Sequence, residues 1–119
     1  MKDVRKNMKE DNRLIFNTSF FAEAAIEKEF LAFLTEEYIP AAEGGGMSLV
    51  HLSSIRSSEA DEAGARAYAV LLACRDEQEL DRFRGRVMEP MLATVKSRWG
   101  MGVMHFSTLM DAIAYGTAD

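Results

Sequence analysis

Residues 65–74 read ARAYAVLLAC, a segment in which apolar side chains occupy both alternating sets of positions. In an extended strand, successive side chains point to opposite faces of the sheet. Tyr68 and Val70 would therefore lie on one face, and Ala67 and Leu71 on the other. A strand that is apolar on both faces needs cover on both sides of its sheet.

Three further segments continue this pattern on either side. Residues 14–21 (LIFNTSFF), 47–56 and 103–110 read as strands, and helical segments follow the first and third strands in the chain. The order strand, helix, strand, strand, helix, strand is that of a duplicated split β-α-β unit. We therefore expect an α+β fold, a ferredoxin-like β-α-β-β-α-β sandwich with a four-stranded antiparallel sheet, assembled as a dimeric α/β barrel.

The first helix is predicted to begin near residue 23. The period changes there to that of a helix, with residues at helical spacing along one side, namely Ile26, Phe30, Phe33, Leu34 and Glu37. Pro40 is expected to end this helix, because proline disfavours helical backbone at the residue before it.

The second helix is predicted to begin after Asp76, which forms a near capping box with Glu79. Pro90 should break or kink it, and a further helical segment should restart there and close at Gly100. Residues 57–64 are predicted to form a polar, acidic hairpin connection, and residues 111–119 a short tail.

Length, composition and charge limit the classes of protein to consider. The chain of 119 residues, 48% of them hydrophobic, can build one core, so we expect one domain over residues 13–113, a mobile extension at 1–12 and a tail at 114–119. A net charge of −5 argues against nucleic acid as a partner. No apolar run approaches the roughly 20 residues that span a bilayer, so no membrane segment is expected.

The single cysteine, Cys74, indicates a reducing, cytoplasmic setting, because neither an intrachain disulfide nor a thiolate metal cage can form. Cys74 precedes a helix N-terminus and Arg75, which would favour a thiolate, but a buried, inert cysteine is the preferred interpretation. The glycines at 44–46 resemble a phosphate loop only superficially, because they lead into a strand.

Two helices in this topology cover one face of the sheet. Apolar side chains from all four strands then face outward on the other side, where burial is worth roughly 25 cal/mol per Å². We therefore predict a homodimer in which two sheets pack face to face or pair at their edges.

His51 and His105 are the only histidines, and each lies on a predicted strand. Those strands usually form opposite edges of the sheet, so a joint metal or acid–base role would need a dimer, and two unrelated histidines are the preferred interpretation.

Aromatic and methionine side chains offer a further hypothesis, an apolar pocket in which Arg56 or Arg98 holds an anionic group. The candidate ligand-binding residues are His51, Arg56, Tyr68, Trp99, His105 and Phe106. No catalytic residue, metal or cofactor is predicted.

Five short motifs resemble an uncharacterised bacterial family of ferredoxin-like proteins, known only as a domain of unknown function and related in shape to dimeric α/β barrels. They run from Arg13 to Ile113: Phe16-Asn17-Thr18, the helix ending Phe33-Leu34-Thr35-Glu36-Glu37-Tyr38-Ile39-Pro40, Tyr68-Ala69-Val70, Pro90 within the second helix, and Arg98-Trp99-Gly100 followed by Phe106-Ser107-Thr108. The chain departs from the family pattern at Tyr38, Leu71 and Ser107, where histidine, glutamine and arginine are common. The resemblance implies a fold and a dimer, and it supplies no activity.

Three functions remain to be compared. The first is a non-catalytic homodimeric module that binds a small apolar or amphipathic ligand, or a protein partner. The second is a cofactor-independent enzyme of the dimeric α/β barrel type, an oxygenase or isomerase, with a cavity whose polar groups would be Asn17, His51, Tyr68 and His105. The third is RNA binding, with Phe16, Phe20 and Tyr68 as stacking platforms, which the acidic balance disfavours.

Overall fold

In the computed structural model of the protein, which describes residues 12–114, four strands form one antiparallel sheet in the spatial order β2-β3-β1-β4. The strands are β1 (Leu14–Glu23), β2 (Ser48–Ile55), β3 (Ala65–Cys74) and β4 (Val103–Asp111). β2 and β4 are therefore the two edges of the sheet. The predicted ferredoxin-like α+β fold is confirmed.

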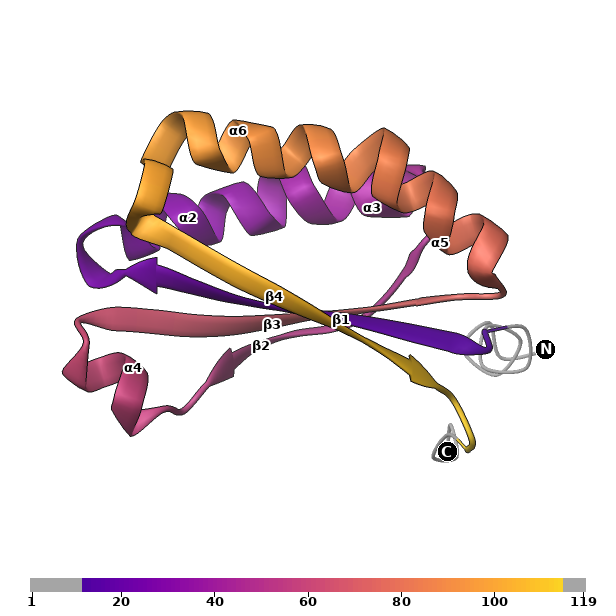
Figure 1. Cartoon of the computed structure of the whole chain (residues 1–119), viewed down its shortest axis with the longest axis horizontal. Coiled ribbons are helices and arrows are strands. Elements are labelled where there is room, and N and C mark those ends of the chain that lie inside the picture. Colours follow the sequence, from indigo (N-terminus) through magenta and orange to yellow (C-terminus); the bar gives the residue numbers. More distant parts are fainter. Residues whose placement is uncertain (1–11, 115–119) are drawn as a thin grey trace, which may run out of the picture.

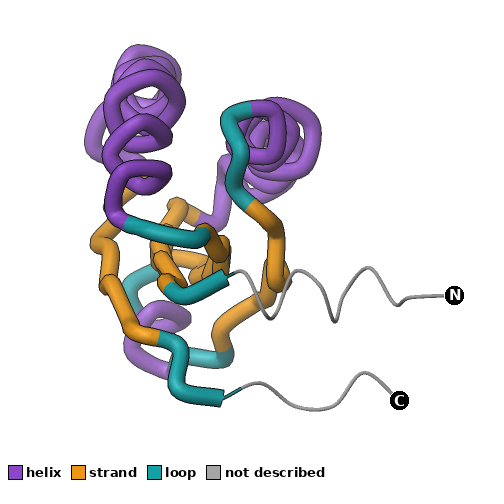
Figure 2. Tube along the Cα trace, turned by 90° about the vertical axis from the view of Figure 1, so that its right-hand side faces the viewer, coloured by secondary structure: helices purple, strands orange, loops and turns teal. Residues whose placement is uncertain are grey.

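Two long helical rows lie side by side on one face of this sheet (Figures 1 and 2). The first row joins β1 to β2 and consists of η1 (Ala24–Ile26), α2 (Glu27–Phe33), η2 (Leu34–Tyr38) and α3 (Ile39–Gly44). The second joins β3 to β4 and consists of α5 (Glu77–Phe83), η3 (Arg84–Met88), α6 (Glu89–Trp99) and η4 (Gly100–Gly102). The short helix α4 (Ser58–Glu62) lies on the opposite side of the sheet (Figure 2).

The core fills the space between the sheet and the two helical rows. Phe16 and Phe20 of β1 are fully buried there, opposite Leu72 and Tyr68 of β3. Phe16, Phe20 and Tyr68 thus lie beneath the helices, where they cannot stack on RNA bases, so the premise of the RNA-binding hypothesis is wrong.

Pro40 does not end the first helix, contrary to the sequence prediction. The helix continues to Gly44, because the five residues before Ile39 form a π-helical turn, Leu34–Tyr38. Proline lacks the N–H that would bond to the carbonyl of Glu36, and its ring clashes with that carbonyl in a regular α-helix. The wider turn removes the conflict.

The second row contains the same device. A π-helical turn, Arg84–Met88, again ends two residues before a proline, Pro90, and α6 continues beyond it to Trp99. The predicted helical segment beyond Pro90 is present, but the helix does not break before it, because Met88 and Glu89 keep α-helical backbone angles. The two turns lie 50 positions apart in the chain, which fits a duplicated β-α-β unit.

The π-helical turn also changes which residue of the first row faces the core. The periodicity placed Glu37 on the same side as the apolar residues, but Tyr38 is fully buried and Glu37 is half-exposed. Because the π-helical turn contains one residue more than an α-helical turn, the position that faces the core moves from residue 37 to residue 38. Glu37 instead forms a bidentate ion pair with Arg98 of α6, at 2.8 and 3.0 Å, which joins the two rows.

The remaining local signals have clear causes. The Asp76 carboxylate caps α5 by accepting a hydrogen bond from the Glu79 amide at 2.9 Å, and Gly100 ends α6 with a φ of +55°, as predicted. The connection after β2 is not only a hairpin loop: Ser57 caps the short helix α4 through the Ala60 amide.

The predicted extension at 1–12 lies, apart from Asn12, outside the described residues, as does the tail beyond residue 114. None of the helices in the described part of the chain is long and apolar enough to span a bilayer.

Candidate binding surfaces around strand β4

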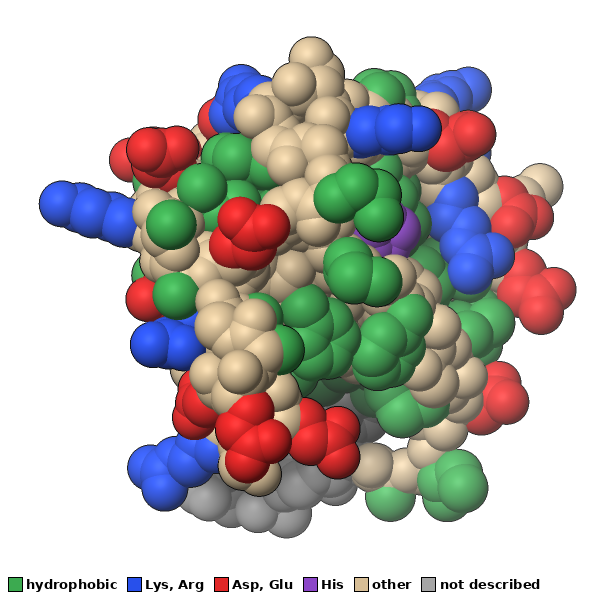
Figure 3. Space-filling model, turned by 60° about the vertical axis from the view of Figure 1, so that its left-hand side comes forward, with side chains coloured by type: hydrophobic (Ala, Val, Ile, Leu, Met, Phe, Trp, Pro, Cys, Tyr) green, Lys and Arg blue, Asp and Glu red, His purple; other side chains and the backbone are tan. Residues whose placement is uncertain are grey.

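Strand β4 is the most exposed element of the sheet. Of its nine residues, Val103 alone is buried, and the exposed fractions of Met104, Phe106 and Leu109 are 62%, 56% and 42%. Figure 3 shows hydrophobic side chains gathered on this side of the molecule around a histidine. An exposed apolar edge strand is an energetic liability unless something covers it.

Both faces of β4 carry such residues, because its side chains alternate. The register with β1 places Leu109, Ser107 and His105 on the side of the helices and Met104, Phe106 and Met110 on the other side. We call that other side of the whole sheet the open face. Its members are Ile15, Asn17, Ser19, Phe21 and Glu23 of β1; Ser48, His51, Ser53 and Ile55 of β2; Ala65, Ala67, Ala69, Leu71 and Ala73 of β3; and Met104, Phe106, Thr108 and Met110 of β4.

The open face carries one charged strand residue, Glu23 at the end of β1. The other strand residues just named are neither acidic nor basic, and the central strand β3 contributes mostly alanines between larger flanking side chains. At one end, Phe106 stacks on Phe21 with ring centroids 5.9 Å apart and planes inclined by 23°. Beside this pair, a hollow of about 390 Å³ extends to α4 and is bordered by Ala60, Met104 and His105. The face is therefore broad, apolar and slightly concave near α4.

On the other side of β4, a groove of about 440 Å³ runs between α6 and the strand. We call it the α6–β4 groove. Leu92, Ala93, Val95 and Lys96 of α6 form one wall, and Val103 and His105 of β4 form the other, with Gly100 and Met101 at the end. The lining is apolar except at Lys96 and His105. The His105 ring lies 5.9 Å from that of the buried Phe20.

Lys96 is a site residue that the sequence interpretation missed. Among the described residues, no carboxylate pairs with Lys96, whereas Arg98, two residues further along, is held by Glu37. That hydrogen-bonded pair also lowers the pKa of Glu37. A lysine on an exposed helical face gives no sequence signal of its own, so only the packing of α6 beside β4 reveals it.

The predicted ligand-binding residues are not brought together at one place. His51 lies on edge strand β2 and on the open face, where Ser53 contacts its ring nitrogen at 2.7 Å, and Arg56 follows β2 in an exposed position. His105 lies on the opposite edge and the opposite face, so within one protomer the two histidines are apart, as expected. Phe106 adjoins His105 in sequence but faces the open side.

Tyr68 and Trp99 belong to the structural framework of the fold. The Tyr68 hydroxyl donates a short hydrogen bond to Glu27, and burial together with that carboxylate raises the pKa of Tyr68 to about 12. Trp99 packs edge-to-face on Phe30 and Phe33, at 5.5 and 5.7 Å. The Tyr68 hydrogen bond joins β3 to α2, and the Trp99 ring contacts join α6 to α2.

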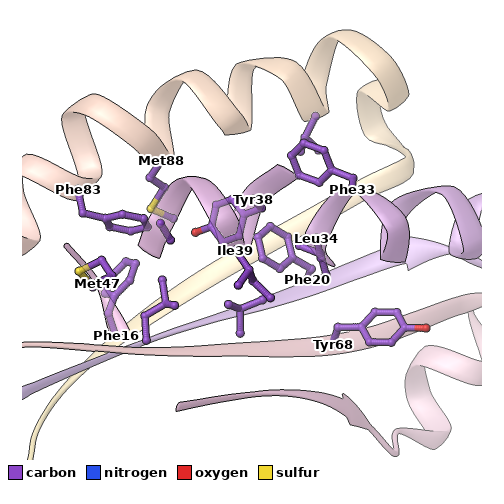
Figure 4. Close-up of a cluster of buried hydrophobic side chains, with 14 of the residues drawn as sticks. Phe16, Phe20, Phe33, Leu34, Tyr38, Ile39, Met47, Tyr68, Phe83 and Met88 are labelled. Carbon is purple, nitrogen blue, oxygen red and sulfur yellow. The ribbon is translucent and has the colours of Figure 1, made fainter. Parts of the chain in front are cut away.

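Two of the positions that depart from the family pattern, the buried Tyr38 and the exposed Ser107, are both neighbours of Thr18 in β1. The Thr18 hydroxyl lies 2.8 Å from that of Ser107, while the fully buried Tyr38 hydroxyl has no hydrogen-bond partner of good geometry among the described residues. Burial raises the pKa of Tyr38 to about 12, and the opposing influence of Thr18 is smaller. Figure 4 shows the Tyr38 oxygen directed among hydrophobic side chains, whereas the Tyr68 hydroxyl points away from them. Leu71, the third departure, lies on the open face.

The glycines at 44–46 border a hollow of about 460 Å³ with Arg82 and Arg86. Their own roles are structural: Gly46 has a φ of +96°, and a Cβ on Gly45 would approach Val87 to 3.0 Å. The amides of Gly45 and Gly46 already donate to carbonyls of α3, so they are not free to hold a phosphate.

Cys74 is buried at the end of β3. Burial is the main cause that raises the pKa of its thiol to about 11, with Glu79 and Asp76 adding to the shift. A thiol with this pKa stays protonated at neutral pH, so the structure favours the inert interpretation. Within residues 12–114, no group of three or more histidine, cysteine, aspartate or glutamate side chains could hold a metal ion.

Comparison with known proteins gives a family and a fold. The family model described as Domain of unknown function (DUF4286) matches residues 13–113. None of the curated proteins matches the chain.

Solved structures with similar folds differ widely in sequence. NE2512, a protein of unknown function from Nitrosomonas europaea, aligns with a TM-score of 0.63 at 12% identity, over 92% of this chain and 97% of that one. The de novo designed protein Foldit4 aligns with a TM-score of 0.58 at 10% identity, over 82% and 96%. A dimeric ferredoxin-like protein from an uncultured marine organism covers 88% and 99% at 9% identity, with a TM-score of 0.48. At sequence identities this low, structural similarity indicates a shared fold and does not indicate an activity.

Proposed function

Because the chain belongs to the family described as Domain of unknown function (DUF4286), whose description assigns no activity, we propose a function from the geometry: a homodimeric, non-catalytic binding module. Two copies associate through their open faces, and each copy retains the α6–β4 groove for a small apolar or amphipathic ligand. The observation that carries the proposal is the largely apolar open face, with Glu23 as its one charged strand residue, which no long helix covers (Figure 2).

The size of the open face supports a second copy as its cover. Four strands of 8 to 10 residues form it. With about 4.8 Å between strands and about 3.3 Å per residue, it measures roughly 19 by 30 Å, on the order of 570 Å². Two such faces in contact remove more than ~1,000 Å² from water, which is enough for a specific interface.

The charge of the protein favours this face over the others. Each copy has a net charge of −5, so two copies repel one another wherever acidic side chains would meet. The strand residues of the open face contribute one charge, that of Glu23 at the end of β1, and their exposed members include Met104, Phe106 and Met110. Association through this face therefore buries apolar area while bringing few carboxylates together.

The enzyme alternative has less support, because its polar residues are divided between the two faces. Asn17 and His51 lie on the open face, whereas His105 and Tyr68 lie on the helical side. A general acid and base must reach the same substrate within hydrogen-bonding distance. On each face the two residues lie on strands separated by a third strand, about 10 Å apart, so the arrangement does not bring an acid–base pair together within one protomer.

Two neighbouring residues provide a matched test of the interface. Met110 and Leu109 are 40% and 42% exposed, but they point to opposite sides of β4. We expect the wild type to be a dimer by light scattering, Met110→Arg to shift it to a monomer, and Leu109→Arg to leave it dimeric. Circular dichroism should show that both variants are folded.

Two results would contradict the proposal. A wild-type monomer at micromolar concentration would show that the open face needs no second copy. Folded monomers for both variants would indicate that the copies pair along the β4 edge instead of packing face to face.

A further inference from the structure

From the lining of the α6–β4 groove, we infer that its ligand is an anionic amphiphile, a small molecule with an apolar body and one carboxylate. This inference specifies the ligand of the binding module proposed above. The apolar body lies against Leu92, Val95 and Val103, and the carboxylate lies between Lys96 and His105.

The shape and lining of the groove favour an apolar body. Its volume of about 440 Å³ is within the range of roughly 300–1,000 Å³ that small-molecule sites occupy. Leu92, Ala93 and Val95 line it from α6, and the exposed Met101 stands at its end. Methionine adapts to varied apolar partners at low cost. A flexible alkyl chain or a small ring system therefore finds apolar contacts along most of the groove.

The charge of the groove selects the head group. Lys96 is the one charged residue among those that line it, and the lining contains no carboxylate to neutralise it. His105 adds a second nitrogen group that can donate a hydrogen bond on the opposite wall. A cationic head group would meet Lys96 without a counter-charge, whereas a carboxylate forms charge-assisted hydrogen bonds with it.

The groove stays accessible in the proposed dimer. It lies on the helical side of β4, because His105 and Val103 point toward that side, while the face assigned to the second copy is the other side. Ligand binding and dimerisation therefore involve opposite faces of the same strand, although His105 at its edge borders both the groove and the hollow beside α4. Each proposed dimer carries two such grooves.

Calorimetric titration with three decyl compounds tests the inference. Decanoate should bind the wild-type protein, while decanol binds at least five times more weakly and decyltrimethylammonium more weakly still. Lys96→Met should weaken decanoate binding by about fivefold to tenfold without changing decanol binding. Lys28→Met, which removes an equally exposed lysine from α2, should leave both affinities within twofold.

Further variants separate the roles of the head group and the body. His105→Gln should weaken decanoate binding, whereas His51→Gln on the opposite edge should not. Ala93→Trp, which fills the groove from its exposed wall, should abolish binding of decanoate and decanol alike. Light scattering on the same samples reports the oligomeric state independently.

Each possible result of these titrations either supports or overturns the inference. Absence of decanoate binding, or equal binding of decanoate and decyltrimethylammonium, overturns the inference, as does an effect of Lys28→Met equal to that of Lys96→Met. A monomeric wild type that still binds decanoate through Lys96 supports the ligand assignment, while it refutes the proposed dimer.

Discussion

Replacing Tyr38 with phenylalanine should stabilise the protein. Tyr38 is fully buried, and its hydroxyl has no hydrogen-bond partner of good geometry within residues 12–114. Its ring packs edge-to-face on Phe20 and Phe83, with centroids 5.7 and 6.3 Å apart. Tyr38→Phe keeps the ring and those contacts and removes only the oxygen.

The expected change in unfolding free energy follows from the cost of burying the Tyr38 hydroxyl without a hydrogen-bond partner. Leaving a buried hydroxyl without a partner costs about 1–3 kcal/mol, because the group gives up its hydrogen bonds to water. We take the lower end, since Thr18 faces the phenol and recovers part of that cost. Tyr38→Phe should therefore raise the free energy of unfolding by about 1 kcal/mol.

Urea denaturation followed by circular dichroism measures the change. With a slope of about 2 kcal/mol per M, the midpoint should rise by about 0.5 M. All variants are compared at one protein concentration, because association shifts apparent stability. Tyr68→Phe is the matched control: it loses the hydrogen bond to Glu27, so the same chemical change should lower stability by about 1 kcal/mol.

The reasoning would be refuted if Tyr38→Phe lowered the free energy of unfolding by 1 kcal/mol or more. That result would mean that the hydroxyl of Tyr38 is satisfied in solution, by a bound water or by a rotated Thr18.

Three further predictions concern pH, glycine conformation and capping. In the folded protein the pKa of Tyr38 and that of Tyr68 are raised from 10 to about 12, so the unfolded chain loses these protons first as the pH rises. The free energy of unfolding is therefore unaffected below pH 10 and decreases between pH 10 and 12. The urea midpoint should fall over this range, and less steeply in Tyr38→Phe. Gly100→Ala should cost about 1–3 kcal/mol, because φ +55° with ψ −123° is a conformation that residues with a Cβ rarely adopt, whereas Gly44→Ala, with no atom within 4 Å of its new Cβ, should cost nothing, by thermal unfolding. Asp76→Ala should cost about 1 kcal/mol of unfolding free energy, which Asp76→Asn should largely restore.

The sequence was sufficient for the architecture because its local signals agree with one another. The strand at 65–74 was predicted with its observed bounds, since the alternating residues are followed at once by the cap at Asp76. The first helix was predicted to end at Pro40 because a proline inside a helix costs several kcal/mol unless the backbone adjusts. The adjustment, a π-helical turn, depends on hydrogen bonds that no periodicity of single residues reveals.

The binding surfaces were only partly predictable. His105 was a candidate because histidines are few, but its partner in the groove, Lys96, is an ordinary exposed lysine until α6 packs beside β4. Tyr68 and Trp99 were assigned to a pocket because buried aromatic residues and ligand-lining ones have the same sequence pattern. Whether a side chain serves the core or a ligand depends on which neighbours fold over it.

The π-helical turn before each proline determines how the helix responds when it loses one residue. Phe30, Leu34, Tyr38 and Ala42 meet the sheet at intervals of four, a spacing that a uniform spiral of 3.6 residues cannot keep in phase. Deleting one residue between 34 and 38 would let the π-helical turn relax to a regular α-helix, in which the four buried residues recur at intervals of four, three and four and stay on one face. Tyr38 and Ala42 would then keep their places in the interior, whereas Pro40 would lose the wide turn that separates its ring from the carbonyl four residues earlier, so the cost of losing one residue falls on the proline.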